Sequence, residues 1–190
     1  MSVIPPVLHL VTDGALVPEL GAHLDAVLRG LPPGRVAVQL REKAMAGGAL
    51  LGLGVALACG ADGVHLPASA VGPAEARRLL GPAALIGVSC HSLAEVERAR
   101  SGGADYASFG PVWATPSKAR YGAPMGLERL REASRLGLPL VALGGVEPAL
   151  APLAFQAGAS GVAAIRAWLT GPDPAAAVRA LLAAAPVAAP

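Results

Sequence analysis

The chain has 190 residues, a length typical of one domain with its own hydrophobic core. Hydrophobic residues make up 54% of the chain and charged residues 15%, which excludes an intrinsically disordered protein. The formal net charge is only +2, no basic block occurs, and aromatic residues make up 3%, so a nucleic-acid-binding protein is not expected.

The cysteines and the N-terminus bear on the compartment. Cys59 and Cys90 form no CxxC pair, and two thiols are too few for a disulfide scaffold. The N-terminal residues lack the basic segment and the long apolar run of a signal peptide. No stretch of 18 or more apolar residues reads as a membrane-spanning helix. We therefore expect a cytoplasmic protein with no membrane or nucleic-acid partner.

Short apolar runs alternate with longer amphipathic runs along the chain. The short runs are rich in Val, Leu and Ile, as strands covered on both faces are, and the longer ones carry apolar residues at helical spacing. This alternation predicts βαβ units around a parallel sheet. In chain order the expected elements are a strand at Val7–Val11, a helix at Leu16–Arg29, strands at Arg35–Leu40 and Gly63–Leu66, a helix at Pro73–Leu80, a strand at Leu85–Ser89, a helix at Leu93–Ser101, a strand at Tyr106–Phe109, a helix at Leu127–Arg135, a strand at Leu138–Leu143, a helix at Pro148–Gln156, a strand at Gly161–Ile165 and a helix at Pro174–Leu182.

The expected strands number one fewer than a (β/α)8 TIM barrel requires. Such a barrel has eight parallel strands, usually in about 200 to 250 residues or more. The shortfall lies between residues 44 and 60, where a single helix-like stretch joins two expected strands. We predict one barrel domain over residues 1–190. Either the barrel is cropped by one strand–helix unit between residues 44 and 60, or the sequence omits a segment there.

Polar side chains follow the second expected strand at Gln39, Arg41 and Lys43. Alternate residues of a strand share a face, so these three point the same way, into the mouth of the barrel. One amide and two cations suit a phosphate or pyrophosphate, and the carboxyl ends of strands carry the active site in such barrels. The alternative is a solvated loop after a strand.

Two further strand ends carry hydroxyl groups. Ser89 ends the fourth strand and can donate a hydrogen bond into the site, whereas His91 is better explained as the start of the next helix, with Ser92 as its N-cap. The long loop after the fifth strand holds Thr115, Ser117 and Lys118, which together make a plausible anion clamp. The alternative for this loop is a flexible surface segment with incidental polarity.

Glycine-rich turns follow the last two expected strands. Leu143-Gly144-Gly145-Val146 ends one strand, and Ile165-Arg166 ends the other. Such turns, opening onto helix N-termini, form the usual phosphate site of these barrels because backbone N–H groups can approach the phosphate where no side chain intervenes.

At these positions the sequence resembles thiamine phosphate synthase and its paralogue, the thiazole tautomerase, and the resemblance spans nearly the whole chain. Its most specific piece is GPVWATPSK at 110–118. The remaining motifs are VTDG at 11–14, QLREK at 39–43, ADGVHL at 61–66, IGVSCH at 86–91, GADYASFG at 103–110, LGGV at 143–146 and GASGVAAI at 158–165.

The resemblance implies a transferase that joins hydroxymethylpyrimidine pyrophosphate to thiazole phosphate and releases pyrophosphate, with Mg²⁺ as cofactor. It implies a homodimer as well. Carried over by position, Gln39, Arg41 and Lys43 would hold the pyrimidine pyrophosphate, with Ser89 and Lys118 beside them. Arg41, Lys43 and Lys118 would be catalytic, because cations stabilise the charge that develops on the leaving pyrophosphate.

The same resemblance assigns the thiazole phosphate to the loop after the fifth strand and to the last two strand ends. The residues concerned are Thr115 and Ser117, together with the backbone at Gly145 and at Ile165–Arg166. Pro116 and Gly144 would also belong to the substrate-binding site. Arg166 stands where a small polar residue is common in the family.

The chain departs from the family pattern at the metal site. The family's Asn-Asp pair falls in the missing segment, and Ala70 stands where a second Mg²⁺-binding aspartate is expected. Pro111 occupies the position of the tautomerase's characteristic histidine. Three hypotheses remain: a synthase, a paralogue without the metal site such as a thiazole phosphate tautomerase, and a non-catalytic phosphate-ligand binder.

Overall fold

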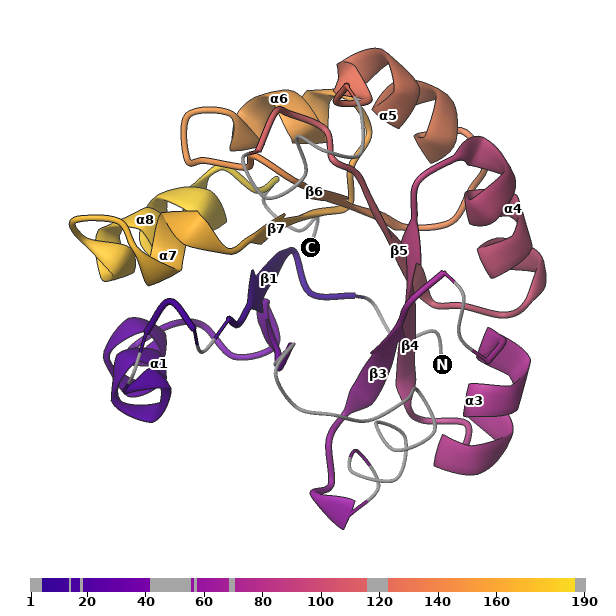
Figure 1. The fold of residues 1–190 in the computed structure, drawn as a ribbon, viewed down its shortest axis with the longest axis horizontal. Coiled ribbons are helices and arrows are strands. Elements are labelled where there is room, and N and C mark those ends of the chain that lie inside the picture. The colour runs from indigo at the N-terminus through magenta and orange to yellow at the C-terminus, as the bar shows by residue number, and fades with distance from the viewer. Residues whose placement is uncertain are drawn as a thin grey trace.

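The structure is a computed structural model that describes residues 5–13, 15–17, 19–41, 56, 58–68, 71–115 and 123–186. All seven expected strands are present within these residues, and they run parallel in one sheet with helices around it (Figure 1). The strands are β1 (Leu8–Val11), β2 (Val36–Gln39), β3 (Gly63–Leu66), β4 (Leu85–Cys90), β5 (Tyr106–Phe109), β6 (Leu140–Leu143) and β7 (Gly161–Ala164). The helices are α1 (Leu20–Leu28), α3 (Pro73–Leu80), α4 (Leu93–Ser101), α5 (Gly126–Ser134), α6 (Ala151–Gln156), α7 (Arg166–Leu169) and α8 (Pro174–Ala183).

The sheet curls into a nearly closed barrel that is open between β2 and β3. The strand order is β2-β1-β7-β6-β5-β4-β3, so β2 and β3 are its two edges among the described strands. Both edge strands are mostly half-buried, whereas β1, β5 and β7 are buried throughout. The opening coincides with the predicted shortfall between residues 44 and 60, much of which lies outside the described residues. The fold is therefore that of a cropped (β/α)8 barrel.

Alternation along the strands separates an outer layer from an inner one. Leu8 and Leu10 of β1 face the helices, where they join the main hydrophobic core with Trp168 and Phe109, both almost fully buried. A smaller apolar cluster lies inside the barrel and consists of Val11, Tyr106, Val141 and Ala163. The inner layer therefore forms the floor of any binding site at the carboxyl ends of the strands.

Two expected helices begin later than predicted, and one helix was missed. The segment after β6 was expected to turn helical at Pro148, but Glu147 O accepts from both Leu150 N and Ala151 N, so a turn precedes α6. The helix expected from Leu16 begins at Leu20 as α1, after a turn. The four-residue α7 has no predicted counterpart, because so short a segment shows no helical periodicity.

An ion pair fastens α3 to the amino-terminal side of the sheet. Asp105 Oδ2 accepts from Ile86 N at 2.6 Å and from Arg77 Nη2 at 2.8 Å. Arg77 also donates to Ala84 O. Three chain segments thus meet at one carboxylate, opposite the end of the barrel where the polar strand ends lie.

We expect Asp105→Ala to lower the free energy of unfolding by about 1 to 3 kcal/mol. The substitution removes the one acceptor shared by a backbone N–H and a guanidinium, so both donors lose that hydrogen bond. Urea denaturation measures this. The matched control is Glu132→Ala, which removes an exposed ion pair with Arg129 and should cost less than about 1 kcal/mol. Equal effects of the two substitutions would contradict a structural role for Asp105.

Candidate active site

A cavity of about 540 Å³ opens at the carboxyl ends of the strands. Every described strand contributes to its wall, as expected where parallel strands end at one rim. Loops after the strands supply further residues, among them Arg41, Gly145 and Arg166. One inward-facing residue from each strand, in sheet order from β2 to β3, is Gln39, His9, Ala163, Val141, Ser108, Ser89 and His65.

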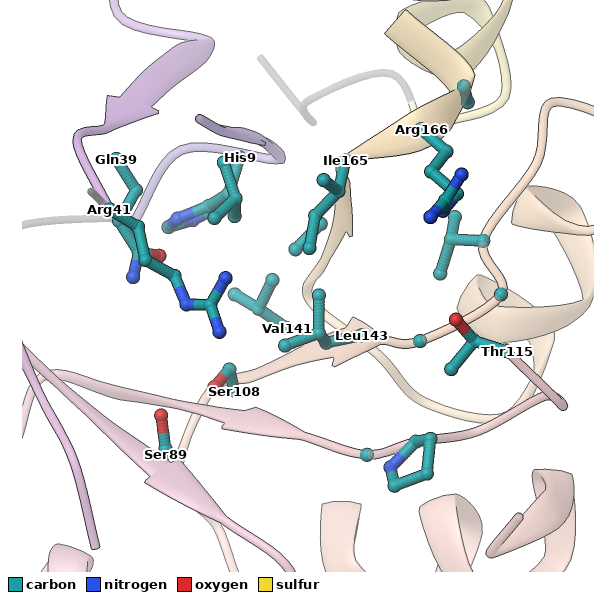
Figure 2. A pocket seen from close by; sticks show the side chains of 18 of the residues that line it. His9, Gln39, Arg41, Ser89, Ser108, Thr115, Val141, Leu143, Ile165 and Arg166 are labelled. Atoms are coloured by element: carbon teal, nitrogen blue, oxygen red, sulfur yellow. The ribbon is translucent and has the colours of Figure 1, made fainter. Parts of the chain in front are cut away.

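One end of the cavity is formed where β2 stops. Gln39 and Arg41 both line it, and Figure 2 shows the Arg41 side chain reaching into the open space. The backbone there is held by the end of β1, because Arg41 N donates to Thr12 Oγ1 at 2.9 Å and Thr12 N donates to Gln39 O at 3.0 Å. The prediction that Gln39 and Arg41 point the same way is confirmed.

The opposite end is formed by the ends of β6 and β7. Gly144, Gly145, Thr115 and Arg166 line it, and Figure 2 shows Arg166 and Thr115 on the side of the cavity away from Arg41. Apolar side chains of Val141, Leu143 and Ile165 lie between this end and Arg41. The cavity thus has two polar ends and an apolar middle.

Gly145 is required by the close approach of the β5 loop. Val112 N donates to Leu143 O at 2.9 Å and Trp113 N to Gly144 O at 3.0 Å, so the loop packs directly on the turn. A Cβ at Gly145 would lie 2.7 Å from Trp113 Cβ and 2.8 Å from Ala114 O, at a φ of +67° that disfavours other residues.

The floor beside Arg41 is a hydrogen-bonded cluster around His65. Its Nδ1 lies 3.0 Å from the Tyr106 hydroxyl, and its Nε2 lies 3.0 Å from Ser89 Oγ and 3.1 Å from Ser108 Oγ. The Tyr106 ring also lies against His9, with ring centroids 4.9 Å apart. One imidazole therefore fixes three hydroxyl groups on the floor of the cavity.

Both floor histidines are neutral at physiological pH. Burial lowers the pKa of His65 to about 4, with smaller contributions from His9 and from the positive charge of Arg41. Burial likewise lowers the pKa of His9 to about 4, against the opposing effect of its hydrogen bond to Pro6. Burial, and then the charge of Asp105, raise the pKa of the Tyr106 hydroxyl above its usual value. The floor is therefore polar but uncharged.

The charged side chains lie around the cavity's rim. Arg41 and Arg166 are the cations among the described lining residues, and Asp13 and Glu147 are the acids. No group of three or more His, Cys, Asp or Glu side chains that could hold a metal ion occurs in the described part of the chain. In the sequence, Glu42 is the single acid in residues 42–55 and 116–122. These donors do not make the oxygen-rich cage that Mg²⁺ or Ca²⁺ prefers.

The structure brings together the predicted site residues that it describes. Gln39, Arg41, Ser89, Thr115, Gly144, Gly145, Ile165 and Arg166 all line the one cavity. Lys43, Pro116, Ser117 and Lys118 lie outside the described residues, so their roles stay predictions.

His91 has the structural role expected of it. Ser92 Oγ accepts from Glu95 N at 3.2 Å, which confirms Ser92 as the N-cap of α4. His91 also lines the cavity, where its Nδ1 lies 2.6 Å from Gly110 O and so ties the end of β4 to the β5 loop.

The floor itself was not predicted. His9, His65, Tyr106 and Ser108 lie within the expected strands, and none of them stands at the carboxyl end of a strand with other polar groups. The available signal was strand alternation, because His9 shares a face with Val11 and His65 faces inward from β3. The cluster depends on cross-strand register, which the sequence does not display.

The architecture and the cavity define a parallel (β/α) barrel whose cavity opens at the carboxyl ends of its strands. A family model described as thiamine monophosphate synthase matches residues 52–168. A putative thiamine-phosphate synthase of Geobacter sulfurreducens is 43% identical, with 94% of each chain covered. The thiamine-phosphate synthase of Roseiflexus castenholzii is 36% identical over 92% of this chain and 86% of that protein. This chain belongs to the thiamine monophosphate synthase family.

A solved structure agrees with this assignment. The thiamine phosphate pyrophosphorylase from Pyrococcus furiosus superposes with a TM-score of 0.74 at 27% sequence identity, covering 96% of each chain. Within the described residues, no helix is both long and apolar enough to span a membrane.

The comparison with the Geobacter protein also bears on the open barrel. The alignment spans 202 positions, whereas 94% of this 190-residue chain is about 179 residues, so about 23 positions have no counterpart here. That deficit is close to one strand with part of a helix, since a strand–helix unit of such a barrel has about 30 residues. It supports a cropped barrel.

Neutral floor histidines predict a pH-dependent stability. In the unfolded chain they titrate near 6.5. Between pH 6.5 and about 4 the unfolded state therefore binds more protons than the folded state, and the free energy of unfolding should fall as the pH is lowered through this range. The full effect is at most about 3 kcal/mol per histidine.

Urea denaturation at pH 7.5, 5.5 and 4.5 checks this. We expect His9→Asn to have a shallower pH dependence than the unaltered protein. His23→Asn is the control, because His23 lies on α1 and bonds Trp168 O outside the cavity. A dependence that is the same in all three proteins would contradict neutral burial of His9.

Proposed function

We propose that this protein is a thiamine-phosphate synthase, a transferase that joins hydroxymethylpyrimidine pyrophosphate to thiazole phosphate and releases pyrophosphate. The observation that carries the proposal is the single cavity with a cation at each polar end and an apolar middle. Two phosphorylated rings fit this arrangement if their phosphates bind at opposite ends and the rings meet between them.

The reaction forms one bond and breaks one. The thiazole nitrogen lone pair attacks the methylene carbon that bears the pyrophosphate, and the carbon–oxygen bond breaks with its electron pair leaving on pyrophosphate. No proton has to be removed from the attacking nitrogen, so a neutral floor is compatible with the chemistry. What the site must supply is orientation and stabilisation of the leaving charge.

We assign the pyrophosphate to the Arg41 end. The guanidinium of Arg41 can form paired hydrogen bonds with phosphate oxygens, and Gln39 and Ser89 add uncharged donors beside it. The family resemblance implies the same role for Lys43 and Lys118 as for Arg41. These cations would stabilise the departing pyrophosphate.

We assign the thiazole phosphate to the opposite end. There the β6 turn at Gly144–Gly145 leaves its backbone accessible, and Thr115 and Arg166 approach from two other segments. The family resemblance adds Pro116, Ser117 and the Ile165–Arg166 backbone to the residues expected at this end. The Arg166 side chain is a cation at this end, which suits a phosphate dianion.

The tautomerase and the non-catalytic binder are less well supported. The relatives compared above carry synthase names, and Pro111, which stands where the tautomerase histidine is expected, lines the cavity without a titratable group. A Mg²⁺ requirement, a homodimer and a cytoplasmic location remain predictions from the resemblance. Since the described donors do not fit a protein-held Mg²⁺ cage, no step above is assigned to the metal.

The test is release of pyrophosphate and formation of thiamine phosphate from the two substrates, with and without Mg²⁺. We expect turnover by the unaltered protein. Binding of thiazole phosphate without turnover would support the non-catalytic binder instead.

Substitutions at the two ends should separate the substrates. Arg41→Gln should raise KM for the pyrimidine pyrophosphate about 10-fold or more, while KM for thiazole phosphate changes little, because a charge-assisted hydrogen bond contributes about 1.5 to 3 kcal/mol. Arg166→Gln should do the reverse. Thermal unfolding of both variants controls for folding. If both substitutions raised the same KM, the assignment of opposite ends would be wrong.

A further inference from the structure

His9 lies on the inner face of β1, where its side chain is only 2% exposed and yet lines the cavity. Leu8 and Leu10 on either side of it face the helices, so strand alternation directs His9 inward. Figure 2 shows its ring on the wall next to Gln39 and Arg41, at the end assigned to the pyrimidine pyrophosphate.

The two ring nitrogens of His9 are not equivalent. Nε2 lies 3.0 Å from Pro6 O, and a carbonyl oxygen can only accept, so Nε2 carries the hydrogen. Because burial keeps the ring neutral, Nδ1 then has a lone pair and no hydrogen. The orientation of the ring thus leaves one hydrogen-bond acceptor to be accounted for.

The surroundings of that acceptor follow by elimination. Among the described residues, no group donates a hydrogen bond to Nδ1. The His9 ring forms its hydrogen bond through Nε2 alone. No side-chain nitrogen or oxygen that is fully buried among the described residues is without a partner, so Nδ1 must be reachable from the cavity that His9 lines. His65 provides the contrast, since both of its nitrogens have partners on the floor.

We propose that His9 determines specificity for the pyrimidine, its Nδ1 accepting a hydrogen bond from an amino group on the pyrimidine ring. The proposal rests on the proposed function, because it needs a pyrimidine at this end of the cavity. The ligand chemistry follows from the acceptor: the ring must carry an N–H donor where it meets β1. A thiazole ring has no such donor, which is consistent with its assignment to the other end.

If an oxo group replaced the amine, its oxygen would face Nδ1, and neither of these two acceptors could donate a hydrogen bond to the other. A switch of the His9 ring to the other tautomer, with the hydrogen on Nδ1, is disfavoured because it would break the hydrogen bond from Nε2 to Pro6 O. Nor can protonation supply a donor near neutral pH. An unpaired polar group of this kind lowers affinity by about 10- to 100-fold.

Two substitutions separate the acceptor from the structural bond. Asn places its amide oxygen where Nδ1 of histidine lies, so His9→Asn keeps the acceptor and loses the donor to Pro6. Gln reaches as far as Nε2, so His9→Gln keeps a donor for Pro6 and loses the acceptor at the Nδ1 position. His23→Gln, on α1, is the matched control outside the cavity.

The experiment measures, by calorimetry, binding of hydroxymethylpyrimidine diphosphate in its amino form and of the same compound with an oxo group in place of the amine. We expect the unaltered protein, His23→Gln and His9→Asn to prefer the amino form by about 10-fold or more. His9→Gln should bind the two forms with affinities within about 3-fold of each other. Affinity for thiazole phosphate should be unchanged in all four proteins.

Three other outcomes would contradict the role proposed for His9 Nδ1. Retention of the preference in a folded His9→Gln, or its loss in a folded His9→Asn, would overturn the role of Nδ1, as would equal binding of both forms to the unaltered protein. If the unaltered protein bound neither pyrimidine, the proposed function itself would fail and His9 with it. Thermal unfolding establishes that each variant is folded.

Discussion

The parallel register of the strands is the constraint on which the cavity depends. Because every described strand ends at the same rim, side chains separated by more than a hundred residues, such as Arg41 and Arg166, come to line one space. Inward-facing positions within the strands form the floor, and residues at and after the carboxyl ends of the strands form the two polar ends. A shift of one residue in any strand would turn its inward side chains toward the helices.

The part of the floor around His65 combines burial with complete hydrogen bonding of the imidazole ring. Burial of His65 leaves neither ring nitrogen without a hydrogen-bond partner, because the hydroxyl groups of Ser89, Ser108 and Tyr106 lie beside its ring. Neutrality keeps positive charge at the rim, where it can meet phosphate groups, and out of the middle, where two uncharged rings would meet. The same neutrality leaves His9 with an acceptor that a donor on a ligand can use.

Much of this arrangement follows from local sequence pattern. Alternation placed Gln39 and Arg41 on one face, and the position of Ser89 and of Gly144–Gly145 after apolar runs placed them in the wall of the cavity. The floor could not be predicted in the same way, because the contacts of His65 join three strands and depend on their register. Pro148 favoured a helix start at that residue, whereas the backbone of Glu147 closes a turn first.

The opening between β2 and β3 and the number of unmatched positions in the Geobacter alignment are both of the size expected for one missing strand with part of a helix. The described strands stop one short of a full circle, and about 23 aligned positions of the Geobacter relative have no residue here. The family's Asn-Asp pair was expected in this part of the barrel. The shortened barrel keeps the cavity's two polar ends, because they are formed by β1, β2 and β4–β7 and by the loops that follow them.

The proposed reaction requires both phosphorylated rings to occupy one cavity, with their phosphates at opposite ends. The most direct measurement is a transferred nuclear Overhauser experiment with thiazole phosphate and an unreactive pyrimidine diphosphate bound together. We expect an effect between protons of the two rings that disappears when either ligand is omitted. If both ligands bound at once and gave no inter-ligand effect, the two rings would lie in separate sites, which would contradict a shared cavity.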